Sequence, residues 1–262
     1  MRRYFGLSLV QLRAAVLLSL QYRVDFFIET VMALFWCGTA LMPLLVLFSM
    51  RDSVAGFSAH EALAVTGFFM ALKGVMVGAI QPSLVNVVEH VRKGTLDFLL
   101  LKPVDAQFML STSKLELPRI ADVLGGLALS AYCVHRAGAR PSPFQIAAAL
   151  LILLCAVAIL YGLWIMVVSL SFRVVKIDNL SHLILSVFDA ARFPVAVFRG
   201  ALAILFTFVI PLGLMTTYPV LALLGRLQPF DMLVPIAVAA LFLVLSRIVW
   251  LRSIRLYTGA GG

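Results

Sequence analysis

Residues 145–170 read QIAAALLILLCAVAILYGLWIMVVSL and contain no charged side chain. An α-helix rises 1.5 Å per residue, so about 20 apolar residues are enough to cross the roughly 30 Å hydrocarbon core of a bilayer. This run is longer than that. An uninterrupted apolar run of this length is typical of a membrane-spanning helix, in which the backbone satisfies its own hydrogen bonds.

The rest of the chain has the same character. Of its 262 residues, 63% are hydrophobic and only 13% are charged, which is outside the range of ordinary soluble domains. Apolar runs recur too often for a single anchor. We therefore predict an all-α, polytopic helical membrane protein with six transmembrane helices in a single transmembrane domain, residues 1–262. Five spans are expected at residues 26–49, 61–80, 117–135, 145–170 and 230–251.

The remaining span, fifth in chain order, has two candidate positions. Hydropathy favours residues 201–225, but Pro211 and Pro219 interrupt that run, so it could instead form a re-entrant hairpin. The competing candidate, residues 179–197, carries Asp189 and Arg192. The residues alone leave both positions open.

The basic residues predict how the chain is oriented. Its net charge of +9 does not indicate nucleic-acid binding, because the Lys and Arg residues lie between apolar runs and not on a soluble module. With a fifth span at 201–225, sixteen of them fall on the side of the termini and four on the other; with 179–197 the split is fourteen to six. Either split predicts a multi-pass protein of the cell (inner or plasma) membrane with both termini cytoplasmic.

The N-terminal segment, residues 1–25, is predicted to be a helix along the cytoplasmic interface. Arg13 interrupts its apolar run, and no small-residue cleavage site follows, so it is not a secretory signal. No soluble domain is expected either, since the longest non-membrane stretches, residues 81–116 and, if the fifth span is 201–225, residues 172–200, are each too short for a core of their own.

Sequence motifs of enzymatic chemistry are absent. The chain has no Gly-x-x-x-x-Gly-Lys-Ser/Thr, Gly-x-Ser-x-Gly or His-Glu-x-x-His motif, and its three cysteines lack metal-site spacing. We therefore do not expect an enzyme, and we predict neither a metal site nor a cofactor.

Ionisable residues within or beside the predicted spans are candidates for a substrate path. A charge in hydrocarbon is costly and often marks a pathway, although such a residue can also reach the interface or pair with another helix. Asp189 and Arg192, three residues apart, could neutralise each other on one helical face. Both interpretations stay open for this set: Glu29, Lys73, Asp122, Asp189 and Arg192.

Small residues predict close contacts between helices. Gly74 and Gly78 are four apart, as are Ala121 and Gly125, and such pairs allow helices to approach closely. The spacing does not distinguish contacts within one chain from contacts between subunits.

The loop at 81–116 contains an amphipathic segment. Leu84, Val87, Val88 and Val91 follow the i, i+3, i+4, i+7 spacing of one helical face. Such a face suits either lipid headgroups or a groove in a partner protein.

That helix is expected to end at Gly94, which follows Arg92 and Lys93. Thr95 would then cap a second short helix, which must stop before Pro103. The loop is therefore predicted to contain two short helices bent at Gly94.

The same segment resembles a known family. Residues 92–103, RKGTLDFLLLKP, fit the pattern basic-x-Gly-x-Leu-Asp-x-Leu-Leu-x-x-Pro of the ABC-2 type exporter permeases, and Gln107-Phe108 follow. Further similarity extends in order along the chain, and it is the order and spacing together that make the resemblance specific. The matching stretches are QYRVDF at 21–26, SLSF at 169–172, RFP at 192–194, FVIP at 208–211, TTYP at 216–219, LLGRL at 223–227 and RLYT at 255–258.

The resemblance implies the transmembrane permease subunit of an ATP-binding cassette exporter. It implies a cytosolic coupling helix that docks on a separate ABC-type ATPase, present in two copies, and a permease that pairs as a homo- or heterodimer among membrane lipids. It also implies a short re-entrant helix before the last span, which favours 179–197 as the fifth span. The implied ATPase contacts are Leu84, Val87, Val88, Glu89, Val91, Arg92, Gly94, Leu96 and Asp97.

The alternative is an ion-gradient-driven transporter or channel without an ATPase. Glu29, Lys73 and Asp122 would then form the ion path. That class commonly carries an inverted repeat, which we do not find in this sequence.

The sequence does not specify the substrate. An apolar path suits a lipid, a drug-like amphiphile or a glycan carrier equally well.

Overall fold

The computed structural model describes residues 2–21, 23–54, 56–172, 186–198, 200, 205–206 and 210–256. Almost all of this is helical, which confirms a polytopic helical membrane protein. Four described segments are long and apolar enough to cross a membrane: Ala59–Arg92, Leu117–Arg136, Pro143–Ser169 and Phe230–Arg255. The described strands are β1 (Ser53–Val54) and β2 (Phe57–Ser58), which pair antiparallel.

The longer helices follow the chain in this order: α1 (Arg2–Gln21), α2 (Arg23–Met50), α3 (Ala59–Val75), α4 (Gln81–Arg92), α5 (Leu96–Leu100), α6 (Ala106–Ser111), α7 (Ile120–Arg136), α8 (Pro143–Ser169), α11 (Tyr218–Leu223) and α12 (Leu233–Arg255). Short 3-10 and π-helical turns join them: η1 (Met76–Ile80), η2 (Leu117–Arg119), η3 (Leu170–Phe172), η4 (Asp189–Arg192), η5 (Val195–Val197), η7 (Gly213–Thr217) and η8 (Pro229–Met232).

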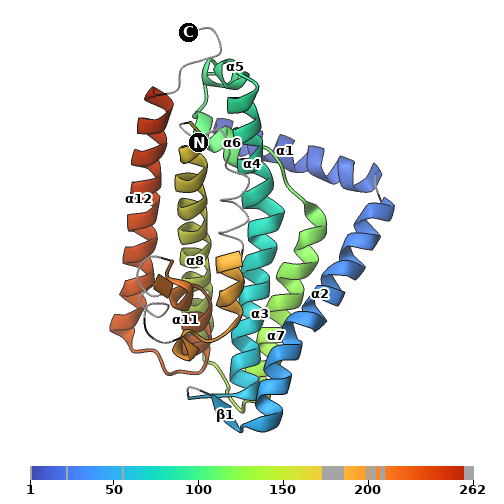
Figure 1. The fold of residues 1–262 in the computed structure, drawn as a ribbon, viewed down its shortest axis with the longest axis vertical. Coiled ribbons are helices and arrows are strands. Elements are labelled where there is room, and N and C mark those ends of the chain that lie inside the picture. The colour runs from blue at the N-terminus through green and yellow to red at the C-terminus, as the bar shows by residue number, and fades with distance from the viewer. Residues whose placement is uncertain are drawn as a thin grey trace.

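The bundle has two distinct ends (Figure 1). Helix α1 lies across one end, which also holds α5, α6 and the last turn of α12; we call it the terminal end. The strands β1 and β2 lie at the opposite end, the hairpin end, where α7 finishes and α8 begins. Helix α2 runs between the two ends.

Capping residues explain where the helices at the hairpin end begin. The Ser58 hydroxyl accepts a hydrogen bond from the Glu61 N–H, and the Glu61 carboxylate accepts one from the Ser58 N–H, so a capping box opens α3. Ser142 and Gln145 form the same box at the start of α8, with Pro143 in its first turn. Both boxes lie within three residues of the predicted span boundaries.

Two pairs of helices make the main contacts, α3 with α7 and α8 with α12. At the first crossing a Cβ atom on Gly67 would lie 2.3 Å from Ser130 Oγ, and one on Gly126 would lie 2.5 Å from the Gly67 carbonyl oxygen. Gly74 and Gly78 are similarly close to Val123 and Arg119. These small residues therefore serve packing within one chain, whereas Gly125 has no atom within 4 Å of its Cβ position.

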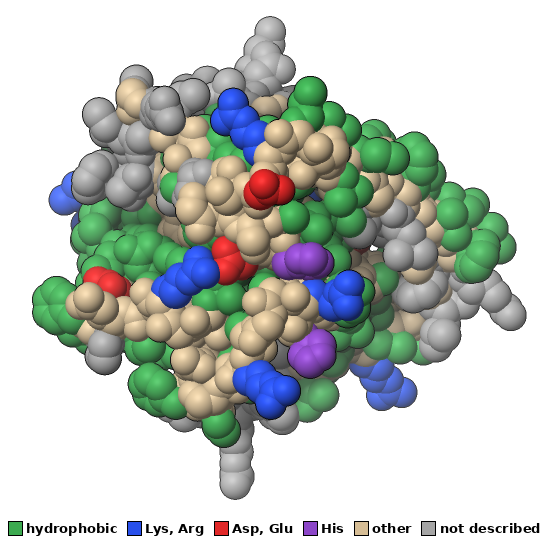
Figure 2. Space-filling model, turned by 90° about the horizontal axis from the view of Figure 1, so that it is seen from below, with side chains coloured by type: hydrophobic (Ala, Val, Ile, Leu, Met, Phe, Trp, Pro, Cys, Tyr) green, Lys and Arg blue, Asp and Glu red, His purple; other side chains and the backbone are tan. Residues whose placement is uncertain are grey.

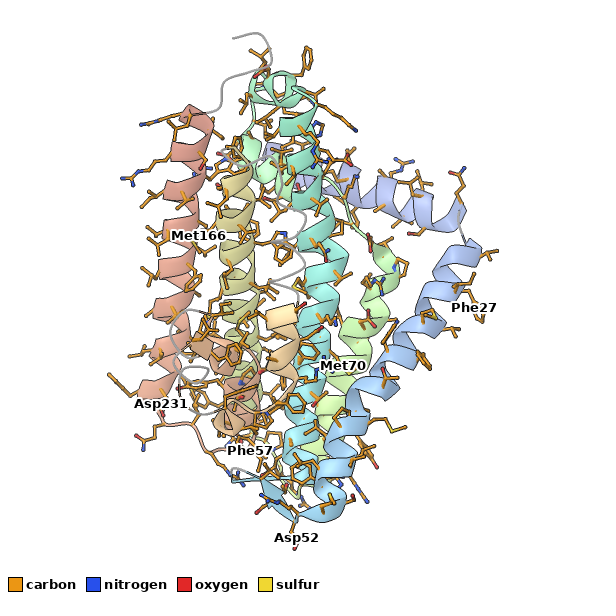
Figure 3. The ribbon with its side chains drawn as sticks, viewed as in Figure 1. Phe27, Asp52, Phe57, Met70, Met166 and Asp231 are labelled. Carbon is orange, nitrogen blue, oxygen red and sulfur yellow. The ribbon has the colours of Figure 1, made fainter. Side chains whose placement is uncertain are left out.

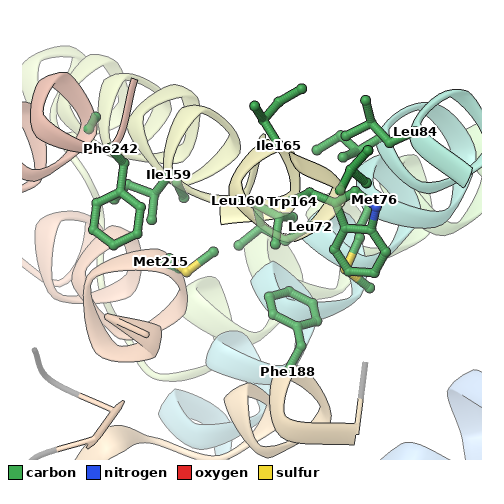
Figure 4. Close-up of a cluster of buried hydrophobic side chains, with 14 of the residues drawn as sticks. Leu72, Met76, Leu84, Ile159, Leu160, Trp164, Ile165, Phe188, Met215 and Phe242 are labelled. Atoms are coloured by element: carbon green, nitrogen blue, oxygen red, sulfur yellow. The ribbon is translucent and has the colours of Figure 1, made fainter. Parts of the chain in front are cut away.

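The hydrophobic core runs between α3 and α8. Figure 4 shows Trp164 of α8 beside Met76 of η1, with Leu84 of α4 on the same side. All three side chains are buried. The core therefore continues from the apolar spans into the segment predicted to be a separate cytosolic helix.

That prediction of a separate helix is wrong in one respect. The expected span 61–80 and the helix expected to follow it form one continuous segment of 34 residues, Ala59–Arg92, with no loop between them. Pro82 lies in the first turn of α4, where its missing N–H is tolerated. The junction is the π-helix η1, in which the Gly78 carbonyl accepts a 2.7 Å hydrogen bond from the Glu116 N–H.

The two candidates for the fifth span are only partly described. Residues 179–185 of one, and 201–204 and 207–209 of the other, lie outside the described residues. The described part of 179–197 includes η4 and η5. The helices η7 and α11 together cover residues 213–223, about 16 Å of rise, and pack on the beginning of α8.

Candidate functional site

A cavity of about 590 Å³ lies between α2, the α3–η1 rod, α7 and η4. Figure 3 shows Met70, one of its lining residues, about two thirds of the way along α3 from the hairpin end. Four of the five candidate in-span charges line this cavity, although three separate segments supply them. The lining residues are Trp36, Thr39, Phe69, Met70, Lys73, Val77, Arg119, Asp122, Asp189 and Arg192.

Two threonines hold η4 against the bundle. Thr66 of α3 donates its hydroxyl to the Arg192 carbonyl at 3.0 Å, and Thr216 of η7 donates to the Ala191 carbonyl at 3.1 Å. Both threonines are almost fully buried. This anchoring fixes Asp189 and Arg192 at the wall of the cavity.

Asp189 is the centre of an ion-pair cluster. Its carboxylate lies 2.6 Å from Lys73 Nζ and 3.8 Å from the Arg192 guanidinium, while Arg192 Nε donates to the Asp189 carbonyl at 2.8 Å. The contact between Asp189 and Arg192, predicted from their spacing, is therefore present. The closer partner is Lys73, which is 116 residues away in the sequence.

Arg119 and Asp122 form the second charged group of the cavity. The Arg119 guanidinium lies 3.7 Å from the Asp122 carboxylate and 3.8 Å from that of Glu116. Sequence reasoning did not single out Arg119, because it counted this residue, at the start of the predicted span 117–135, among the basic residues on the side of the termini. Its proximity to Gly78, whose missing side chain leaves room for the Arg119 stem, could not be inferred from the spacing alone.

Aromatic side chains form the apolar part of the cavity wall. The Phe69 ring centroid lies 5.6 Å from Lys73 Nζ and 6.0 Å from Arg192 Cζ, within range of cation–π attraction. Phe188 packs against Phe69, with the two ring centroids 5.4 Å apart. Trp36 of α2 is 62% exposed and faces the cavity.

Glu29, the remaining candidate, is a residue of α2. Its side chain lies outside the described part of the chain.

A second candidate site, the predicted coupling segment, is at the terminal end. Its apolar face is turned inward: Leu84, Val87 and Leu96 are each 0% exposed and belong to the main core. Val88 and Val91 pack partly against the same core. The face that the sequence presented as a docking surface is thus covered by the chain's own helices, because α4 continues α3 and keeps its apolar side toward α8.

The exposed residues of this segment surround the turn between α4 and α5. Gly94 has φ +65°, a left-handed conformation that glycine adopts readily, and it ends α4 as predicted. Phe98 and Leu101 are 70% and 82% exposed. We call the following set the tip: Glu89, Arg92, Lys93, Asp97, Phe98, Leu101 and Lys102, all exposed.

The predicted cap by Thr95 is not formed. Its hydroxyl lies 2.8 Å from His90 Nδ1, and it makes no side-chain hydrogen bond to the first turn of α5. The Thr95 side chain therefore links the start of α5 to α4 across the turn.

A polar network attaches the tip to the spans. Asp105, just after α5, pairs with Arg247 of α12, and Arg247 also donates to Gln107 at 2.8 Å. Gln107 in turn donates to the Tyr161 hydroxyl of α8 at 3.1 Å. Partial burial acts to raise the pKa of Asp105, but hydrogen bonds from Arg247 and the Phe108 N–H outweigh it and lower the pKa below its usual value.

The hairpin end has its own charged contact. Arg226 pairs with Glu61, whose side chain is 8% exposed, and this links the loop after α11 to the start of α3. Figure 2 shows this end with basic, acidic and histidine side chains scattered among hydrophobic ones. Sequence reasoning placed both residues at span boundaries without pairing them.

A family comparison decides what kind of protein carries these two sites. The sequence profile described as ABC-2 family transporter protein matches residues 34–261. The chain belongs to the ABC-2 transporter family. The match covers the cavity, the tip and the network around Arg247, so the family resemblance seen in the tip sequence extends over nearly the whole chain. No curated protein and no solved structure matches it.

Membership of the ABC-2 family gives the chain its general role as a membrane-embedded transport subunit of an ABC transporter, not itself catalytic. The polar groups of the two sites are consistent with binding and positioning. Among the described residues, no group of three or more His, Cys, Asp or Glu side chains could hold a metal ion.

Proposed function

We propose that this ABC-2 protein is the permease subunit of an exporter powered by a separate ATPase that docks on the tip. The observation that carries the proposal is the pair Phe98 and Leu101, two large apolar side chains left exposed on a short helix at the terminal end. Exposed aromatic and aliphatic side chains surrounded by charges are typical of interface anchors. The family supplies the class of partner.

The buried residues of the coupling segment take a different role in this proposal. Leu84, Val87 and Leu96 would hold the tip rigidly on α8, while Glu89, Arg92 and Asp97 would contact the ATPase together with Phe98. Movement of the ATPase would then be transmitted along one continuous helix into the membrane, with the turn at Gly94 setting the angle of α5. Two ATPases would act on two permease subunits, identical or related.

The proposed topology has six spans in the cell membrane and both termini in the cytoplasm. Support comes from the basic residues, which are concentrated on one side, and from α1, α5 and the end of α12, which lie at the same end of the bundle (Figure 1). Residues 1–25 would lie along the cytoplasmic interface. We keep 179–197 as the fifth span and 201–225 as an outer hairpin, because Pro211 and Pro219 interrupt the second run and the family resemblance implies a short re-entrant helix before the last span.

The decisive test is co-purification in mild detergent from the native membrane. A P-loop ATPase should accompany the wild-type protein, and the double substitution Phe98→Ser with Leu101→Ser should lower its recovery about thirtyfold, the effect of losing about 2 kcal/mol at an interface hot spot. Phe230→Ser is the matched control, because Phe230 is 75% exposed at the hairpin end.

Transport without any associated ATPase would instead support the ion-gradient mechanism. In that case Lys73→Gln and Asp122→Asn should abolish uptake driven by an ion gradient, while the double tip variant should transport normally.

A further inference from the structure

The cavity beside Lys73 has a charged lining, the volume of a ligand site and side chains that stay accessible. It is lined by three cations, Lys73, Arg119 and Arg192, and by two carboxylates, Asp122 and Asp189. Its volume of about 590 Å³ lies within the roughly 300–1,000 Å³ of small-molecule sites. Lys73 and Asp189 remain 44% and 34% exposed despite their ion pair.

Hydrocarbon alone is a poor occupant for such a cavity. Charged groups at membrane depth are costly unless they meet water, a partner or a polar ligand. Lys73 lies seven residues before Ile80 along one continuous rod, about 10 Å from the terminal-end boundary of the predicted span. Lys73 therefore lies deeper than the headgroups, and Arg119 near the boundary itself, so both are within reach of a molecule that enters from the adjacent leaflet.

The cations of the cavity can still bind an anion in addition to their present partners. The contacts from Arg119 to Asp122 and from Arg192 to Asp189 are 3.7 and 3.8 Å, longer than the roughly 2.7–2.9 Å of a charge-assisted hydrogen bond. Each guanidinium can present a planar pair of donors to a phosphate or carboxylate. Phe69 holds two of the cations in place through its ring face.

We propose that this cavity binds an anionic amphiphile, whose phosphate or carboxylate headgroup meets Lys73, Arg119 and Arg192 and whose apolar chain lies along Trp36 and Val77. The lining holds three cations and two carboxylates, and Glu116, outside the lining, lies 3.8 Å from Arg119, so the site has no excess of negative charge that would repel one anionic headgroup. This deepens the proposed export function by naming the substrate class. It rests on that function only in treating the bound amphiphile as cargo.

Tryptophan fluorescence provides a direct test, because Trp36 is 62% exposed in the cavity while Trp164 and Trp250 are 0% and 1% exposed. The full-length protein in neutral detergent is titrated with lysophosphatidic acid carrying a brominated chain, which quenches by contact. Lysophosphatidylcholine with the same chain is the matched zwitterionic probe. The anionic probe should reach half-maximal quenching at a concentration about tenfold lower, as expected for one additional charged hydrogen bond.

Variants locate the effect. Lys73→Gln, Arg119→Gln and Arg192→Gln should each reduce the difference between the half-maximal quenching concentrations of the two probes. Trp36→Phe should remove the saturable quenching. Arg192→Lys, which keeps the charge, should retain most of the preference for the anionic probe. A preference that is lost only in Arg192→Gln is therefore not the result of a folding defect. Arg140→Gln, at the hairpin end, is the control and should behave as wild type. Inorganic phosphate alone should not displace the probe.

Equal quenching by both probes, or an anionic preference that survives all three charge-removing variants, would overturn the proposal. The measurement uses no ATPase. Failure to bind would therefore leave the tip proposal intact, and failure to recover an ATPase would leave the amphiphile site intact.

Discussion

At the scale of single residues, Lys73 and Asp189 illustrate how a membrane protein tolerates charge. Each alone would be expensive at this depth, but a 2.6 Å contact lets them neutralise each other, and Arg192 adds a third group through its bond to the Asp189 backbone. Removing one partner of such a group costs more than removing both, since it leaves a charge without compensation. The cluster therefore stabilises η4 while keeping a polar surface open to the cavity.

Asp105 gives a pH-dependent prediction. Its folded pKa is lowered, so the ionised carboxylate contributes stability above the ordinary value of 3.8, and this contribution is lost as pH falls through the folded pKa. Asp105→Asn should lower the melting temperature in detergent above about pH 5, by the equivalent of at most about 1 kcal/mol, because both partners are about a third or more exposed.

The difference between wild type and Asp105→Asn should shrink below pH 3.8, as measured by melting curves in one detergent at several pH values. Asp231→Asn, at the hairpin end, serves as the comparison. A difference that stays constant down to the most acidic samples would mean that the carboxylate charge of Asp105 does not contribute.

At the scale of elements, the crossing of α3 and α7 depends on the absence of side chains. Gly67→Ala and Gly126→Ala should each destabilise the protein by about 1–3 kcal/mol, because the new Cβ would lie within 2.6 Å of backbone or Ser130 atoms. Gly125→Ala, one residue away, should be neutral or slightly stabilising, since its Cβ position is open and alanine favours helix. Thermal unfolding in detergent distinguishes them; equal effects at Gly125 and Gly126 would contradict the packing.

The elements also show what can be read from the sequence. Apolar runs near 61–80, 117–135, 145–170 and 230–251 predicted four of the long helices, each of which is apolar and long enough to cross a bilayer. The amphipathic period of α4 was predicted as well. The direction of its apolar face was not, because a period specifies that a face exists and not which surface covers it: Leu84 and Val87 of α4 are buried in the core with residues of α8.

The cavity was predictable only in part. Lys73, Asp122, Asp189 and Arg192 stood out because ionisable residues are rare in apolar runs. Their assembly depends on contacts more than a hundred residues apart and on a π-helix and Gly78 that make room for Arg119. Trp36 looked like an ordinary apolar residue of its span.

At the scale of the whole molecule, the two sites are joined by a single rod. Residues 59–92 run from the hairpin end, past Lys73 in the cavity wall, to the tip, so a displacement of the tip has a rigid path to the site. The π-helix η1 lies between them, where the Gly78 carbonyl accepts a hydrogen bond from the Glu116 N–H.

Labelling of single cysteines tests this arrangement. In a chain whose three cysteines are replaced by alanine, Leu101→Cys should react with a membrane-impermeant maleimide only after permeabilisation, and Phe230→Cys should react in intact cells. Both positions are well exposed.

The same labelling of Val197→Cys distinguishes the two candidates for the fifth span. With a span at 179–197, Val197 lies at the outer end and reacts in intact cells; with a span at 201–225, it remains cytoplasmic and reacts only after permeabilisation. The first result is expected, because Pro211 and Pro219 interrupt the run at 201–225, and Asp189 and Arg192 are already neutralised within the bundle.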